Sequence, residues 1–171
     1  MSYPNYCCRC NRRDTKIIAH RENALDYFSC YQQHDFIIQA VVDGRGKFIN
    51  AVCGFPGSAH DARVLQNSEL YYNAERGNIL QAPVVTIGGR DISAYPQAPW
   101  LIKPFPKGTR DPEEQTFNKE LSRARVTVER VFGILKSRWR VLQKRFDSSL
   151  EFAIKCAVAC IVLHNICVDQ K

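Results

Sequence analysis

Apolar residues recur at steps of three and four along residues 117–142, which is the spacing of one face of an α-helix. The positions are Phe117, Leu121, Ala124, Val128, Val131, Leu135, Trp139 and Leu142. The preceding Asp111-Pro-Glu-Glu114 has the form of a helix start, with a capping residue, a proline suited to the first helical position and acids in the first turn. The pattern predicts a long amphipathic helix with one buried stripe.

Strand-forming residues dominate two nearby segments, 36–42 and 48–53. The connection Asp43-Gly-Arg-Gly-Lys47 supplies the glycines of a tight turn, so the two segments predict an antiparallel hairpin. Pro56-Gly57-Ser58 should end the second strand, with the serine as the N-cap of a short helix over residues 61–71.

The rest of the chain adds a strand, a loop and a final helix. Residues 83–87 are predicted to form a strand that runs into two glycines, and the Pro-rich, aromatic stretch 93–106 is predicted to form an ordered loop. Ser148-Ser-Leu-Glu151 has the form of a capping box and opens an apolar helix through Ile166. Because that helix is apolar on most sides, we expect it to be buried across the sheet.

Residues 1–15 are rich in Cys and Arg without any period, so we expect an irregular N-terminus followed by one domain over residues 16–168. The 171 residues, of which 45% are hydrophobic, are enough for one core of mixed α/β type. No apolar run approaches the ~20 residues that a membrane span needs, and no signal peptide is recognisable, so we expect an intracellular protein. In such a compartment Cys156, Cys160 and Cys167 are expected to be small buried apolar residues.

Positive charge is concentrated in one part of the chain. Between Lys103 and Arg145 there are twelve Lys and Arg residues and five Asp and Glu residues, which accounts for the whole net charge of +7. A localised basic surface indicates a polyanionic ligand, and nucleic acid is the commonest large one.

Glu129 is a single acid among the cations of the predicted long helix. Arg125, Gly133, Lys136 and Arg140 lie at helical offsets of −4, +4, +7 and +11 from it, which makes a ridge of cations with one acid and one gap. This pattern is expected of a metal ligand beside a phosphate backbone. The alternative is a set of ordinary surface ion pairs.

Metal-assisted cleavage of a phosphodiester fits this combination of acids and cations. Two Mg²⁺ or Mn²⁺ ions about 4 Å apart need several carboxylates that converge from strand ends and from a helix packed over the sheet. Asp91 fits because it follows the predicted strand 83–87 after a short glycine turn, and Glu129 fits as the helix-borne acid. Asp61 lies in the first turn of a predicted helix, where the dipole alone also favours an acid.

Five blocks, in order, resemble the PIF/Harbinger-type transposase nuclease domain of the DDE superfamily and together cover about residues 16–168. The blocks are Phe55–Leu65, Ser93–Phe105, Phe117-Asn118 with Ser122-Arg123, Val128–Lys136 and Val162–Cys167. The resemblance implies a ribonuclease H-like fold, a mixed sheet with flanking helices, here lacking part of the first strand. It also implies DNA cleavage with two divalent metal ions held by Asp, Asp and Glu.

The resemblance further implies a protein of the nucleus, and also of the cytoplasm, that acts on DNA with a separate Myb-like DNA-binding partner protein and no membrane. Glu129 matches the third acid of the family. Asp91 matches the second acid if Ile92 is a one-residue insertion. At the first acid an ungapped match gives Asn11, and Asp14 fits only with a three-residue shift.

Two classes of function follow. The first is a metal-dependent DNA endonuclease with Asp91 and Glu129 as metal ligands, Asp14 as a candidate third ligand and Asp61 and His60 as neighbours. The second is a non-catalytic descendant that binds DNA or a protein. In the first, the phosphate contacts are assigned to four cations: Arg125, Lys136, Arg138 and Arg140.

Overall fold

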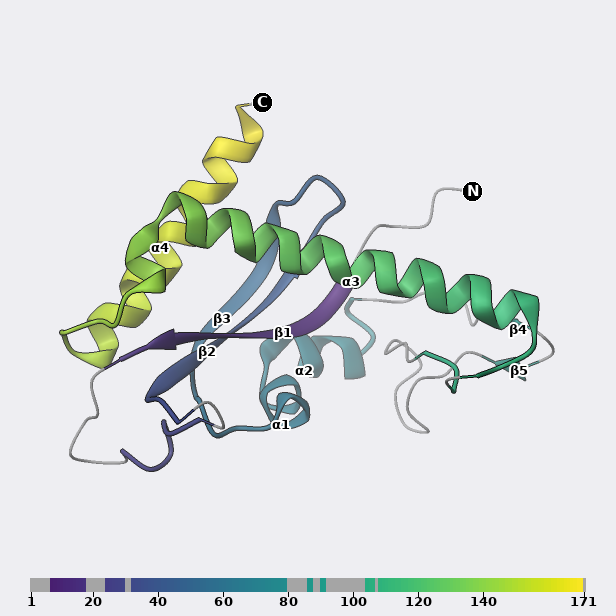
Figure 1. Cartoon of the computed structure of the whole chain (residues 1–171), viewed down its shortest axis with the longest axis horizontal. Helices are drawn as coiled ribbons and strands as arrows, with labels where there is room; N and C mark the ends of the chain where they lie inside the picture. The colour runs from purple at the N-terminus through teal and green to yellow at the C-terminus, as the bar shows by residue number, and fades with distance from the viewer. Residues whose placement is uncertain are drawn as a thin grey trace. The chain divides into compact units, whose positions relative to one another are not determined.

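The computed structural model (Figure 1) describes residues 7–17, 24–29, 32–79, 86–87, 90–91, 104–106 and 108–170. For residues 7–14, 61, 86–87 and 90–91, only the backbone is described. The chain divides into two compact units, the first formed by Met1–Gln66 with Thr127–Lys171 and the second by Asn67–Val126. Helix α3 (Pro112–Arg138) therefore contributes one segment to each unit.

Three antiparallel strands form the sheet of the first unit, in the order β1-β2-β3. β2 (Asp35–Val42) and β3 (Phe48–Pro56) form the predicted hairpin, and β3 ends at the proline as expected. The sequence predicted irregular structure over residues 1–15 and an incomplete first strand. From Cys7 onward the structure instead has a ten-residue strand, β1 (Cys7–Lys16), because the backbone of β2 supplies hydrogen-bond partners that no local pattern records.

Gly54 forms a bulge in β3, where Ile37 of β2 pairs with Phe55 and Ile38 pairs with Cys53. The glycine has a φ of 108°, and a Cβ built on it would lie 2.7 Å from Cδ1 of Ile154 in α4 (Leu150–Asp169). The dihedral angle therefore favours glycine at this position, and a larger residue would also force the end of the Ile154 side chain to move.

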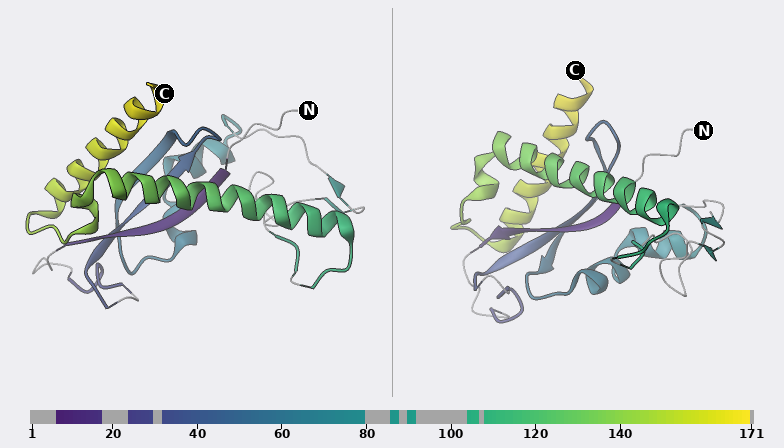
Figure 2. Two further views of the ribbon diagram at one scale, coloured as in Figure 1. Left: turned by 45° about the horizontal axis from the view of Figure 1, so that its top comes forward. Right: turned by 45° about the vertical axis from the view of Figure 1, so that its right-hand side comes forward.

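The core of the first unit lies between the sheet and two helical segments, α4 and residues 127–138 of α3. Figure 2 shows both segments on the same side of the strands. Alternate residues of β2 point toward them, as the pleat of a strand dictates. The cluster includes Phe36, Ile38, Ala40 and Val42 from β2, Val128, Val131, Phe132 and Leu135 from α3, and Ala153, Ala157, Cys160 and Ile161 from α4. The buried stripe predicted for α3 is confirmed in this segment.

Helix α3 starts where the sequence predicted but ends earlier. Asp111 Oδ1 accepts a hydrogen bond from Glu113 N at 2.9 Å, which confirms the predicted start. The helix ends at Arg138, because Trp139 has φ −115° and ψ 84°, and a 3-10 helix, η1 (Arg140–Gln143), follows. The side chain of Gln143 donates to the carbonyl of Lys136 at 3.1 Å and satisfies one of the carbonyls left open at the helix end.

Helix α4 buries one face and exposes the other, whereas the sequence predicted burial on most sides. Its N-cap is Ser149, one residue later than predicted, and Ser149 Oγ accepts a hydrogen bond from Phe152 N at 3.3 Å. The small residues of the buried face bring the helix close to the sheet, and the described sheet covers that face alone. The exposed large apolar side chains of α4 are Phe152, Val158, Val162, Leu163 and Ile166.

By length and composition α4 could cross a membrane, and it is the one helix in the described part of the chain that meets this criterion. The sequence had led us to expect no such segment. The core helix of a soluble protein meets the same criterion, so length and composition alone carry little weight. The packing of Ala153, Ala157 and Cys160 against the sheet is an observation of a different kind, because it assigns one face of the helix to the protein core.

The second unit contains α2 (Glu69–Glu75), the short hairpin of β4 (Thr86–Ile87) and β5 (Arg90–Asp91), and the first half of α3. Asn118 in α3 accepts a hydrogen bond from Phe105 N at 2.8 Å and donates one to Phe105 O at 3.3 Å. This pairing ties the loop before α3 to the helix. Most of the predicted strand 83–87 and of the predicted loop 93–106 lies outside the described residues.

Candidate functional site

Glu129 is held on a rigid segment of α3. Its neighbours Val128 and Val131 and the nearby Phe132 are buried in the core against the sheet, while Glu129 itself is half-buried. The ring of Phe132 packs edge-on against Phe48 of β3 with centroids 5.4 Å apart. The carboxylate therefore projects from the edge of the buried face, on a helix segment that this face fixes by packing.

A gap lies beside Glu129 on the same ridge of the helix. Arg125 and Lys136 are half-buried, and Gly133 is exposed. Within the described part of the chain, a Cβ built on Gly133 meets no atom within 4 Å outside the backbone of its own helix. The predicted arrangement of one acid, one gap and two flanking cations is thus present in α3 as far as Lys136.

The two other candidate phosphate contacts, Arg138 and Arg140, lie off this ridge. Arg138 is the last residue of α3, and its guanidinium carbon is 6.0 Å from the ring centre of Trp139. Arg140 lies in η1 and not on the helix, so the predicted helical offset of +11 from Glu129 does not apply. The cause is the break at Trp139 described above. Both arginines are exposed.

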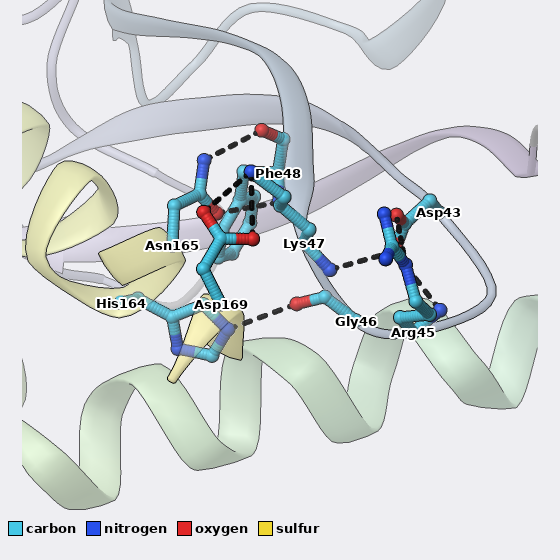
Figure 3. A network of polar contacts seen from close by, with 8 residues as sticks. All are labelled: Asp43, Arg45, Gly46, Lys47, Phe48, His164, Asn165 and Asp169. Atoms are coloured by element: carbon cyan, nitrogen blue, oxygen red, sulfur yellow. Dashed lines mark hydrogen bonds and ion pairs between the residues drawn. The ribbon is translucent and has the colours of Figure 1, made fainter. Parts of the chain in front are cut away.

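The turn between β2 and β3 contacts both α4 (Figure 3) and α3. His164 Nε2 lies 2.9 Å from the carbonyl oxygen of Gly46, and Asn165 makes two hydrogen bonds of 2.8 Å with the backbone N and O of Phe48. Lys47 Nζ pairs with Asp169 at 2.6 Å. On its other side the turn meets α3, because a Cβ on Gly46 would lie 3.1 Å from Cγ2 of Val131. Sequence reasoning used His164 and Asn165 only as part of a family block and missed this role.

Gly57 fixes the connection between β3 and α1 (Asp61–Gln66). Its N–H donates to the carbonyl of Asp35 at 3.0 Å, and a Cβ on Gly57 would lie 2.6 Å from that same carbonyl oxygen. Only glycine fits so close to a neighbouring backbone. The glycine of the Phe55–Leu65 block therefore has a packing role, and the connection leads directly to Asp61.

His60 caps α1, which corrects the prediction that Ser58 does. His60 Nδ1 accepts a hydrogen bond from Ala62 N at 3.3 Å, and its carbonyl accepts from Val64 N at 3.1 Å. The single helix predicted over 61–71 is two helices, because Ser68 Oγ accepts from Tyr71 N at 3.2 Å and starts α2. Asp61 is the first residue of α1, and its side chain lies outside the described structure.

The other candidate acids are placed by their backbones. Asp91 ends the β4–β5 hairpin, where it pairs with Thr86, and it belongs to the second unit, whereas Glu129 belongs to the first. Asp14 lies in the regular part of β1 opposite Ile37. Asn11 lies between Arg9 and Arg13, where the register of β1 shifts. Glu129 is thus the one candidate acid whose side chain the structure describes.

Among the residues that the structure describes, no group of three or more His, Cys, Asp or Glu side chains is placed to hold a metal ion. The candidate donors are carboxylates, which suit Mg²⁺ and Mn²⁺ in type. At the first-acid position the sequence offers Asn11 or Asp14, and the side chains of both lie outside the described structure.

Thiol chemistry finds no support in the described cysteines. Burial raises the pKa of Cys53 to about 12, and burial together with neighbouring Cys156 raises the pKa of Cys160. Thiols of this kind are protonated and poorly nucleophilic at neutral pH. Cys160 is buried as predicted, while Cys156 and Cys167 are half-buried, and all three are free.

Comparison with known proteins identifies relatives along almost the whole chain. A family model described as DDE superfamily endonuclease matches residues 9–165. The Arabidopsis thaliana protein named Protein ALP1-like is 29% identical over 143 residues, which is 78% of this chain and 35% of that protein. The mouse protein named Putative nuclease HARBI1 is 30% identical over 149 residues, which is 85% of this chain and 41% of that protein.

Another Arabidopsis thaliana relative is named Protein antagonist of like heterochromatin protein 1 and is 27% identical over 153 residues, which is 84% of this chain and 39% of that protein. The chain thus spans 35–41% of the length of these relatives. No solved structure matches it significantly.

Proposed function

The chain belongs to the DDE superfamily endonuclease family, and from this premise we propose that it is a transposase-derived DNA endonuclease that uses two divalent metal ions. Relatives from mammals carry the name of a nuclease, which supports the reaction class. Their matched regions cover less than half of each relative, so the activity of the whole relative is part of the proposal.

The observation that carries the proposal is the surrounding of Glu129. A half-buried carboxylate projects from the edge of the packed face of a helix, next to the open space at Gly133 and between Arg125 and Lys136. A strand of nucleic acid needs room and nearby cations for its phosphates. Helix α3 thus carries open space for the strand, cations for its phosphates and a carboxylate for the metal.

Endonucleases of this superfamily generally use divalent metal ions, which activate the attacking water and stabilise the charge on the leaving oxygen. In our proposal Asp91 and Glu129 hold the metal ions, and Asp14 replaces the first acid. Asp61 lies next to the site. Arg125, Lys136, Arg138 and Arg140 bind the phosphates and orient the strand. Arg138 and Arg140 reach it from the end of α3 and from η1.

The wider setting follows from the family. We propose a ribonuclease H-like fold, which the antiparallel sheet β1-β2-β3 with helices on its core face supports. We also propose that the chain acts on DNA in the nucleus beside a Myb-like partner that supplies sequence recognition. The basic segment that carries the whole net charge supports a polyanionic substrate.

Nicking of supercoiled plasmid in Mn²⁺ tests the proposal. The purified chain is compared with Glu129→Gln, with Glu120→Gln and with an EDTA control. Glu120 is a matched control, because it lies on the same helix, is 58% exposed and pairs with Arg123. We expect nicking by the wild type and by Glu120→Gln, and its loss in Glu129→Gln and in EDTA.

Nicking that persists in Glu129→Gln would assign the activity to another residue or to a contaminant. Absence of nicking in the wild type, with plasmid binding retained, would overturn the endonuclease proposal for this chain. It would leave the non-catalytic DNA-binding protein as its function.

A further inference from the structure

An open pocket of about 640 Å³ lies in the first unit at the end of β1. Three segments line it: the end of β1 with Ile17, the turn before β2, and the end of η1 with the chain that follows it. The lining residues are Lys16, Ile17, Gln32, Gln33, His34, Gln143 and Arg145. None of the residues assigned above to catalysis or to phosphate contact is among them.

Backbone hydrogen bonds hold the three segments of the pocket together. Phe146 N donates to the carbonyl of Lys16 at 3.0 Å, and Ile17 N donates to the carbonyl of His34 at 2.8 Å. The rings of His34 and Phe28 pack edge-on with centroids 5.2 Å apart. The pocket is therefore built on paired backbone and not on a single loop.

The side chains of the pocket favour an anion. Among the described residues, the lining includes Lys16 and Arg145 as cations, His34 and three glutamine amides, and no carboxylate. Nε of Arg145 pairs with Asp147 at 3.3 Å, but a guanidinium has further N–H donors that can bind a second anion. A tetrahedral phosphate group, which accepts several hydrogen bonds and carries charge, suits this set of donors.

The pocket follows the Glu129 region along the chain. From Glu129 to the end of α3 at Arg138 the helix advances about 14 Å, which is the length of about four nucleotides of one strand in a duplex. The 3-10 helix η1 (Arg140–Gln143) then leads to Gln143 and Arg145 of the pocket. Arg138 and Arg140 lie between the two places.

We propose that this pocket binds a phosphate group of the DNA strand that passes Glu129, as an anchor separate from the catalytic site. The DNA source of the phosphate rests on the proposed function, whereas the anion chemistry of the pocket does not. The ligand class is a phosphate, and a free nucleotide or inorganic phosphate would satisfy the same donors.

The experiment compares two double variants of the full chain. Lys16→Gln/Arg145→Gln removes the two cations of the pocket. Arg45→Gln/Lys155→Gln removes two exposed cations elsewhere, whose side chains are 80% and 72% exposed. Binding of a fluorescein-labelled duplex is measured by anisotropy in EDTA at several salt concentrations. Thermal unfolding is measured with and without inorganic phosphate at constant ionic strength.

We expect the pocket variant to bind the duplex about tenfold more weakly than the control variant, and its log K against log salt slope to be smaller by about one. Inorganic phosphate should raise the Tm of the wild type and of the control variant but not of the pocket variant. Gln33→Glu, which adds a negative charge to the pocket, should act in the same direction and provides a second, independent variant.

The other outcomes test the phosphate pocket and the DNA source of its phosphate separately. Loss of the phosphate effect on Tm with unchanged duplex binding would keep the phosphate pocket and overturn DNA as its source. If duplex binding and phosphate effect are alike in the two double variants, the pocket is not a phosphate site. Because binding is measured without metal, the result stands whether or not the chain cleaves DNA.

Discussion

His164 Nε2 lies 2.9 Å from the carbonyl oxygen of Gly46, and this contact ties α4 to the turn between β2 and β3. The ring of His164 also packs against Phe48, with centroids 5.1 Å apart, and is 1% exposed. The same turn approaches Val131, two residues beyond Glu129 on α3. His164 and Asn165 thus fix the turn to α4, and the turn packs against α3, the helix that carries the candidate catalytic acid. We call the contacts of His164 and Asn165 with the turn the clamp.

Removal of this clamp should destabilise the fold. His164→Ala leaves a cavity beside Phe48 and an unsatisfied carbonyl, so we expect a loss of about 2–4 kcal/mol in the free energy of unfolding. Asn165→Ala, which loses two hydrogen bonds, should cost about 1–3 kcal/mol. Val162→Ala on the exposed face of α4 is the control and should change stability by less than about 1 kcal/mol. Urea unfolding measures all three, and equal effects at Val162 and His164 would argue against the clamp.

Gly46→Ala should separate the effect of a contact from that of a dihedral angle. Gly46 has a φ of 85°, and Gly108 has a φ of 90°. Alanine at either position should lower the free energy of unfolding by about 1–2 kcal/mol, because residues with a Cβ disfavour the left-handed region. Only at Gly46 does the new Cβ also press on Val131, at 3.1 Å, since nothing lies within 4 Å of a Cβ at Gly108. We therefore expect the larger loss of stability in Gly46→Ala, and equal losses would mean that the turn does not press on α3.

The turn should also respond to acid through Asp43. Partial burial opposes ionisation of this carboxyl, but hydrogen bonds from the N–H groups of Lys47 and Arg45 and the charge of Arg45 outweigh it and hold its pKa below the ordinary value of 3.8. A lowered folded-state pKa adds stability that is present above pH 3.8 and is lost as the pH falls through the folded-state value. The difference in unfolding free energy between wild type and Asp43→Asn should be constant at neutral pH and shrink below about pH 4. A difference that persists unchanged into strong acid would contradict this assignment.

Much of the architecture could be predicted from local sequence. The β2–β3 hairpin was recognised from its strand formers and glycines, and the start of α3 from its capping Asp111. The missed features depend on tertiary contacts. β1 exists because β2 supplies a partner, and α3 ends at Arg138, just before Trp139, whose ring centre lies 6.4 Å from that of His164. One face of α4 is exposed because the described sheet covers the other face alone.

The candidate site was predictable only in part. Glu129 and its flanking cations were found because a single helix carries them, and helical spacing is readable from sequence. The pocket at Lys16, His34 and Arg145 was missed because its residues come from three separate segments. No spacing rule joins residues 16, 34 and 145, and the pairing of Ile17 with Phe146 and its hydrogen bond to His34 bring them together.

The position of the first acid leads to a prediction about gain of activity. If Asn11 occupies that position, Asn11→Asp supplies the missing negative charge and should raise the nicking rate in Mn²⁺ by about 10- to 100-fold. If Asp14 serves instead, Asp14→Asn should abolish nicking and Asn11→Asp should change little. Plasmid nicking across a Mn²⁺ titration distinguishes the two assignments. Indifference to both substitutions would exclude both residues as the first acid.

The gap at Gly133 gives the most direct test of where the substrate lies. Gly133→Ala adds a methyl group into open space and replaces the poorest helix former but proline, so it should raise stability by about 0.5–1 kcal/mol and leave nicking intact. Gly133→Leu should fold equally well, but its side chain would fill the space beside Glu129 that a phosphate backbone needs. We expect it to weaken duplex binding at least tenfold and to abolish nicking.

Ala159→Leu provides the matched control, because it adds comparable apolar bulk at an exposed position of α4. Thermal unfolding of all three variants separates blocked binding from a damaged fold. Full activity in a stably folded Gly133→Leu would show that the strand does not pass through the gap. The phosphate contacts assigned to Arg125 and Lys136 on either side of it would then have to be withdrawn.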